Sequence, residues 1–127
     1  MEYRTQGGDY KVGFPFKDVN GNKISLPSLD DYAITIYRVC GGKKEMLFLF
    51  RKGGTGMSAI EVDSVDDSIG LVILNRYFTA EINPNELFAE VEIQVAQTGY
   101  INGKANAKET GISLFKLCEA ANKRAIQ

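Results

Sequence analysis

The chain has 127 residues, of which 15 are basic and 16 acidic, so its net charge is only -1. No stretch concentrates lysine and arginine as a nucleic-acid-binding face does, and we expect no nucleic acid partner. Histidine is absent, which excludes Ser-His-Asp and Cys-His nucleophile pairs and zinc sites with a histidine ligand. A chain of this length buries roughly two-thirds of its unfolded surface, and we expect a single domain over residues 1–127.

The first apolar segment predicts an edge strand. Tyr10, Val12, Phe14 and Phe16 recur with a period of two, which places their side chains on one face. Pro15 lies between the last two and cannot donate a hydrogen bond to a ladder, so the strand belongs at a sheet edge or a bulge. An Asn-Gly sequence follows and predicts a tight turn.

The next two segments predict a hairpin. Residues 32–39 form the first strand and residues 45–51 its partner, with a glycine pair at the reversal. Apolar side chains point to both faces of the second strand: Met46, Leu47, Phe48, Leu49 and Phe50. Such a strand is either a central strand covered on both sides or a surface meant for another chain, and both interpretations stay open.

The second half of the chain continues this pattern. Residues 57–65 and 71–75 predict two strands joined by an acidic turn. Residues 87–96 predict a long strand with apolar side chains facing in and polar side chains facing water. A loop then leads to a closing strand over residues 112–118, and residues 119–127 are expected to be a tail or a short helix.

Together these segments predict an all-β fold of about seven or eight antiparallel strands, arranged as one immunoglobulin-like or jelly-roll β-sandwich. Its core is expected over residues 6–118. The N-terminus has neither the basic nor the apolar region of a signal peptide, and no apolar run approaches the roughly 18 residues of a membrane span. We therefore expect a soluble chain made in the cytoplasm, with no membrane partner.

No constellation in the sequence predicts an enzyme, a cofactor or a metal site. Cys40 and Cys118 lack C-x-x-C spacing and are expected to be free thiols, with a disulfide as the alternative. The segment that starts at Asp18 resembles a calcium loop, but its twelfth position is Leu29 and not the bidentate glutamate, which favours a hairpin turn. The acidic residues within 63–67 are expected to be solvated turn residues.

The doubly apolar segment 45–51 is the predicted interface. We expect one of its faces to meet another chain, and the terminal segments 1–6 and 119–127 to reach across to neighbours in a homo-oligomer. The candidate interface residues are Met46, Leu47, Phe48, Leu49, Phe50, Tyr3 and Ile126.

Four segments carry a resemblance to a known family: QGGDY at 6–10, LPSLDDYAITIY at 26–37, LFAEVEIQV at 87–95 and TGISL at 110–114. Their order resembles a β-sandwich domain of structural proteins from tailed phages that infect gut bacteria, similar in layout to the N-terminal sandwich of upper baseplate proteins. Such domains tend to have a glycine just before the long strand, where this chain has Asn85 and Glu86. We also expect no fibre-forming or receptor-binding extension.

The resemblance implies a virion component that docks on other virion structural proteins, as a head fibre, a capsid decoration or a tail or baseplate attachment module. It brings no catalytic residues. The alternative is a carbohydrate-binding or adhesin-like module, because tyrosine and phenylalanine rings can stack on sugars as well as fill a core.

Overall fold

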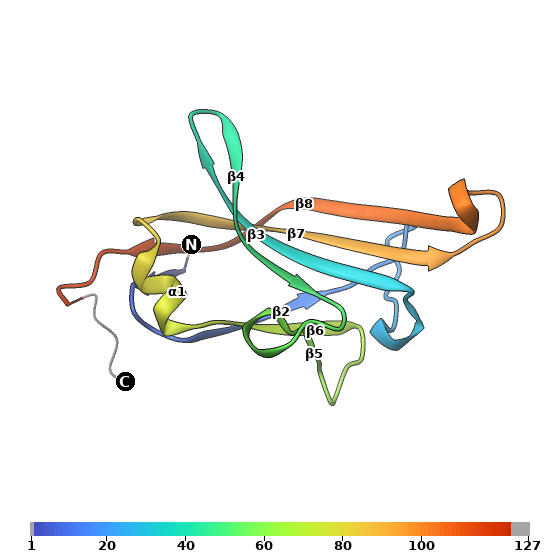
Figure 1. The fold of residues 1–127 in the computed structure, drawn as a ribbon, viewed down its shortest axis with the longest axis horizontal. Helices are drawn as coiled ribbons and strands as arrows, with labels where there is room; N and C mark the ends of the chain where they lie inside the picture. Colours follow the sequence, from blue (N-terminus) through green and yellow to red (C-terminus); the bar gives the residue numbers. More distant parts are fainter. Residues whose placement is uncertain (1, 123–127) are drawn as a thin grey trace.

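The computed structural model, which describes residues 2–122, consists of two packed β-sheets (Figure 1). The five-stranded sheet has the order β1-β8-β7-β3-β4 and the three-stranded sheet the order β2-β6-β5. The strands are β1 (Tyr3–Thr5), β2 (Tyr10–Pro15), β3 (Asp31–Cys40), β4 (Lys43–Arg51), β5 (Glu61–Val62), β6 (Ile69–Leu74), β7 (Asn85–Ala96) and β8 (Lys104–Cys118). The predicted all-β sandwich is confirmed.

One α-helix and three short 3-10 helices join the strands. The α-helix α1 (Arg76–Glu81) connects β6 to β7, and so passes from one sheet to the other at one end of the sandwich (Figure 1). The 3-10 helices are η1 (Leu26–Ser28), η2 (Gly56–Ser58) and η3 (Ile101–Gly103). Within the part of the chain that the structure describes, no helix is both long and apolar enough to cross a membrane.

The core lies between the two sheets, where alternate side chains of each strand face inward. In β3 the inward residues are Tyr32, Ile34 and Ile36, as the alternation predicts. Across the sandwich, Phe16 packs edge-to-face on Tyr32 with 5.5 Å between ring centroids. Burying a large apolar side chain stabilises a fold by about 1.5–3 kcal/mol relative to leaving it exposed, and these inward rows therefore hold the sheets together.

The predicted edge strand and its turn are confirmed. β2 lies at one edge of the three-stranded sheet, and Pro15 pairs only with Ile69 of β6. In the turn that follows, the Asp18 carboxylate accepts hydrogen bonds from the backbone N–H groups of Asn20 and Asn22, both at 2.9 Å. The segment that starts at Asp18 is thus a tight turn closed by its own side chain.

For β1 and β8 the structure differs from the strands that the sequence predicts. β1 pairs with β8 in parallel, whereas the sequence predicts antiparallel strands and does not predict β1. β8 begins at Lys104, so the predicted loop before residue 112 is wrong. Ala105 is buried and pairs with Val95 of β7, but an alanine gives a weak apolar signal in the sequence.

The predicted strand over residues 57–65 is also wrong, because the range contains only the two-residue strand β5 and one isolated bridge at Ala59. Gly56 adopts a left-handed conformation with φ of 58°, which starts the 3-10 turn η2 in place of a strand. The following turn places the Ser58 carbonyl oxygen 2.5 Å from the point that a side-chain carbon of Gly54 would occupy. Only glycine at position 54 leaves room for this turn.

Candidate interaction surface

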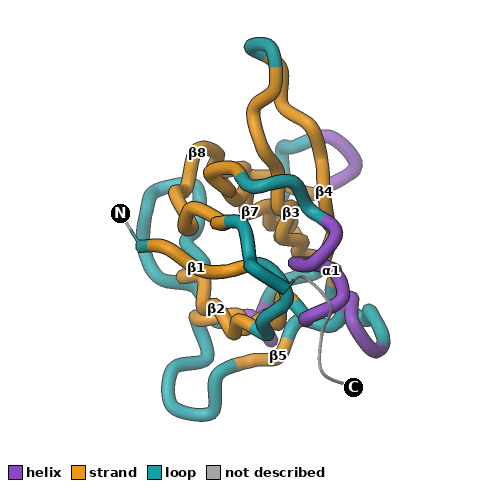
Figure 2. Tube along the Cα trace, turned by 90° about the vertical axis from the view of Figure 1, so that its left-hand side faces the viewer, coloured by secondary structure: helices purple, strands orange, loops and turns teal. Residues whose placement is uncertain are grey.

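The β3–β4 hairpin is the most prominent projection of the molecule. Gly41 and Gly42 form its two-residue loop with φ of 60° and 78°, as a reversal with positive φ at both positions requires. β3 pairs with β7 only as far as Tyr37, whereas its pairing with β4 continues to Cys40. Beyond Tyr37 the hairpin therefore diverges from β7, which itself continues to Asn85, and its tip stands clear of the body in two perpendicular views (Figures 1 and 2).

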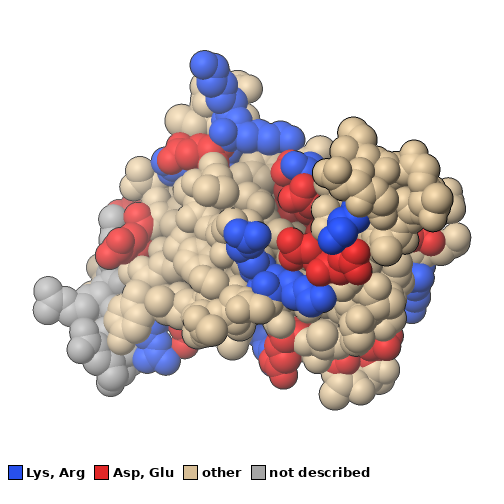
Figure 3. Space-filling view, turned by 45° about the vertical axis from the view of Figure 1, so that its right-hand side comes forward, with Lys and Arg blue, Asp and Glu red and all other residues tan. Residues whose placement is uncertain are grey.

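The hairpin tip carries charged and apolar side chains side by side. Arg38 donates two hydrogen bonds to the Glu45 carboxylate, at 3.1 and 3.2 Å. Val39 is 45% exposed and Met46 is 64% exposed. The space-filling view shows basic side chains at the end of this projection (Figure 3). A partner that binds here would cover apolar surface between charges of both signs.

β4 is the outermost strand of its sheet, so the interpretation of residues 45–51 as a central strand is wrong. One edge of β4 pairs with β3 along its length. On the opposite edge the described residues supply a single bridge, between Arg51 and Ala59. An edge strand with unpaired backbone groups is a template for another strand, and β4 has such an edge along most of its length.

The apolar side chains of β4 divide between the core and the surface. Phe50 is 1% exposed and belongs to the core, which corrects its prediction as an interface residue. Phe48 lies 4.6 Å from Phe50 and 4.7 Å from Phe78 of α1, measured between ring centroids, and it packs against the same core together with Leu47. Met46 is exposed. The sequence predicted where the strand lies but not which of its side chains face the core and which face the surface.

The other predicted interface residues lie elsewhere. Leu49 is half-buried on the outer face of the five-stranded sheet, beside Thr35 of β3. Tyr3 is 62% exposed in β1, at the opposite edge of that sheet. Ile126 lies outside the described residues, with most of the predicted C-terminal tail.

A polar network fixes the base of the hairpin to the neighbouring strands. The Lys44 ammonium group donates to the Thr110 hydroxyl at 2.7 Å, lies 3.6 Å from the Glu90 carboxylate and sits 5.1 Å from the centre of the Tyr37 ring. The Tyr37 hydroxyl in turn accepts a hydrogen bond from the Gly111 N–H at 3.0 Å. These contacts connect β3, β4, β7 and β8 and hold the projecting tip in one orientation.

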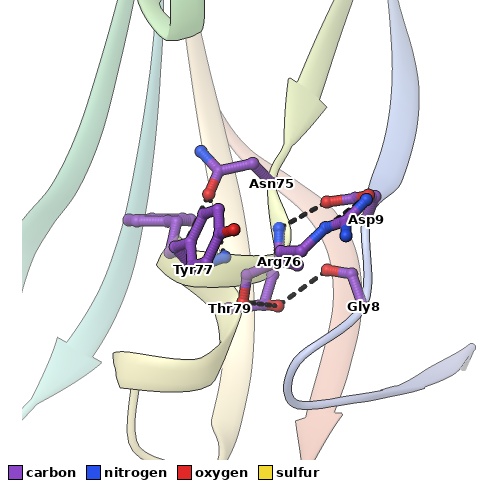
Figure 4. A network of polar contacts seen from close by, with 7 residues as sticks. Gly8, Asp9, Asn75, Arg76, Tyr77 and Thr79 are labelled. Carbon is purple, nitrogen blue, oxygen red and sulfur yellow. Dashed lines mark hydrogen bonds and ion pairs between the residues drawn. The ribbon is translucent and has the colours of Figure 1, made fainter. Parts of the chain in front are cut away.

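A second network ties the segment after β1 to α1 (Figure 4). The Asn75 side chain caps α1 by accepting hydrogen bonds from the N–H groups of Tyr77 and Phe78. Asp9 accepts hydrogen bonds from the backbone and the guanidinium group of Arg76. The Arg76 side chain is the main reason why the pKa of Asp9 lies below its usual range.

Buried polar groups complete this connection. Thr79 is fully buried; its hydroxyl donates to the Gly8 carbonyl at 2.7 Å and accepts from the Gly7 N–H at 3.1 Å. Gln6 is 5% exposed and donates from its amide to the Ile82 carbonyl at 2.6 Å. Residues 3–5 form β1, which pairs with β8 in the five-stranded sheet of their own chain.

Cys40, exposed at the hairpin tip, and Cys118, at the end of β8, are both free thiols. Among residues 2–122, no group of three or more His, Cys, Asp or Glu side chains is arranged to hold a metal ion. The carboxylates of Asp63 and Asp66 accept hydrogen bonds from backbone N–H groups of their own turn, at 2.8 and 3.0 Å.

Asp66 makes the turn before β6 sensitive to acid. Hydrogen bonds from Ser68 and from Lys23 lower its pKa from 3.8 to about 2. The stability that this carboxylate contributes is therefore present above pH 3.8 and is lost as the pH falls through about 2. Wild type should be more stable than Asp66→Asn near neutral pH, and urea unfolding curves of the two should converge on acidification. A difference that is unchanged at low pH would contradict this assignment.

No protein-family model matches the sequence, and no curated protein matches it. The resemblance to phage structural domains therefore remains a prediction.

Proposed function

We propose that the protein is a non-enzymatic structural component of a phage particle, which docks on other virion chains and on copies of itself through the β3–β4 hairpin. The observation that supports docking best is the open edge of β4 at the base of a projecting tip with exposed Met46 and Val39. Backbone groups on such an edge give affinity, and neighbouring side chains give specificity.

The edge also carries features that restrict nonspecific pairing. Lys43 and Lys44 lie at its outer end, and a register irregularity follows Ile36 in the pairing of β3 with β4. Charged side chains and bulges on edge strands oppose aggregation in natural sheets. A partner strand is therefore expected to need acidic side chains opposite this lysine pair, which narrows the proposed partner to a chain with a complementary edge.

Charge introduced at the tip tests the proposed self-association. We expect the double variant Val39→Asp/Met46→Asp to shift the oligomer to monomer in light scattering across a concentration series, because aspartate at these positions would be desolvated on contact. The matched control is Val65→Asp, since Val65 is 93% exposed in the turn before β6. An unchanged mass for the tip variant, with native circular dichroism, would reject the hairpin as the self-association surface.

The place in a virion is tested separately. We expect the coding gene to lie next to portal, capsid or terminase genes. We also expect mass spectrometry to detect the chain in purified phage particles. Polysaccharide-utilisation genes alongside would instead favour the adhesin-like alternative.

A further inference from the structure

A shallow groove crosses the outer face of the five-stranded sheet, away from the hairpin tip. One hollow is lined by residues that include Ala33, Leu49 and Arg51, and a second is lined by residues that include Tyr100 and Lys104. The two hollows adjoin because Gln94 and Asn106 line both, a continuity that the sequence pattern does not reveal.

Strand register explains why these side chains meet. Ala33 of β3 pairs with Arg51 on one side and with Glu92 on the other. In the next row on the same face, Gln94 of β7 pairs with Asp31 and with Asn106. Side chains on one face of paired strands stand next to each other, so two adjacent rows of polar groups cross four strands, a span of about 14 Å.

Several of these polar side chains have no hydrogen-bond or ion-pair partner in the part of the chain that the structure describes. The side chains of Arg51, Gln94 and Asn106 make no hydrogen bond or ion pair with the residues that the structure describes. Together they present guanidinium donors and amide groups that both donate and accept. The backbone of β7 is already paired on both sides over this region, whereas β8 pairs here with β7 alone because β1 meets it only from Lys116 onward. Side chains therefore form the recognition surface along the middle of the groove.

The mixture of groups selects the class of ligand. Asp31 disfavours an anion and Arg51 disfavours a cation. Two further charged groups are already paired, because Glu92 lies 3.6 Å from Lys108 and Lys104 lies 3.6 Å from Asp30. A hydroxyl group donates and accepts hydrogen bonds, and it satisfies amides and charges of both signs. Alanine and leucine in the floor offer an apolar surface, and the half-exposed ring of Tyr100 offers an aromatic one at the far end.

We propose that this groove binds a neutral oligosaccharide, whose hydroxyl groups bond to Arg51, Gln94 and Asn106 and whose ring stacks on Tyr100. The chemistry agrees with a ligand site in which a few placed polar groups fix the orientation of the ligand on an apolar floor. This inference does not rest on the hairpin as a docking surface, because the two regions share no residue that either test changes.

Backbone amide NMR on the full chain tests the proposal. The probes are cellohexaose, xylohexaose and mannohexaose at millimolar concentration, with hexagalacturonate as the acidic comparison. At least one neutral probe should shift the amide signals of residues around Gln94 and Asn106, and should do so more strongly than the acidic one. No shift with any neutral probe, shifts confined to another face, or tighter binding of the acidic probe would overturn it.

A double variant and a matched control locate the binding. Gln94→Ala/Asn106→Ala removes two amides from the groove and should weaken the binding of the neutral probe about tenfold. Asn20→Ala/Asn22→Ala removes two exposed amides from the turn after β2 and should leave binding unchanged. Equal affinities for the two double variants, both folded by circular dichroism, would place the sugar elsewhere and reject this site.

Discussion

Replacing Phe50 with alanine is expected to lower the free energy of unfolding by about 3–5 kcal/mol. The side chain is 1% exposed, packs in the core cluster and contacts the Phe48 ring. Alanine removes most of the buried apolar area and leaves a cavity that the two sheets close only in part. Urea denaturation followed by circular dichroism measures the change, as a lower midpoint with an unchanged slope.

Two further substitutions in the same strand separate the core from the surface. Phe50→Leu keeps most of the volume and should cost less than Phe50→Ala. Met46→Ala lies four residues away on the exposed part of β4 and should change stability by no more than about 0.5 kcal/mol. Similar costs for Met46→Ala and Phe50→Ala would contradict the division of β4 into a buried and an exposed part.

This division shows the limit of the sequence pattern. Alternation predicts β3, β4 and β7 correctly, because each has a row of large side chains at a period of two. In β4 both rows are apolar, so the pattern cannot say which row faces the core. Its place at the sheet edge follows from pairing with distant strands, and a local pattern carries no such information.

The elements that the sequence missed are short or lack large apolar side chains. α1 has six residues, fewer than an isolated helix needs, and it exists because Asn75 caps its start and Phe78 packs on Phe48. In the sequence, Asn75 was the residue that could have indicated where this helix begins. β1 has three residues held by parallel pairing with β8, and no periodic pattern can arise over such a length.

The candidate surfaces depend on the same long-range pairing. Gly41 and Gly42 predict where the hairpin turns, but its projection depends on β7 ending its pairing at Tyr37. The groove is still harder to predict, since Arg51, Asp31, Gln94 and Asn106 come from four strands and become neighbours only through register. Each of these residues alone resembles an ordinary solvated side chain.

The buried Thr79 hydroxyl is one of the groups that hold the segment between β1 and β2, and Thr79→Val should destabilise the protein by about 2–3 kcal/mol. Valine has nearly the same shape as threonine, so packing changes little, but the Gly8 carbonyl and the Gly7 N–H each lose their partner. Leaving a buried polar group without a hydrogen bond costs more than the net contribution of the bond itself. Hydrogen exchange should show faster exchange of the Gly7 amide.

Thr35→Val provides the matched control for this loss. Thr35 lies on the outer face of β3, and its hydroxyl makes no hydrogen bond to the described residues. Valine also suits a strand, so the change in stability there should stay within about 0.5 kcal/mol. If Thr79→Val costs no more than Thr35→Val, the Thr79 hydroxyl does not hold residues 6–9 in place. A large cost confined to Thr79→Val would instead show that this hydroxyl contributes more to the connection between the N-terminal segment and α1 than the ion pair of Asp9 and Arg76, because that pair is solvent-exposed and screened.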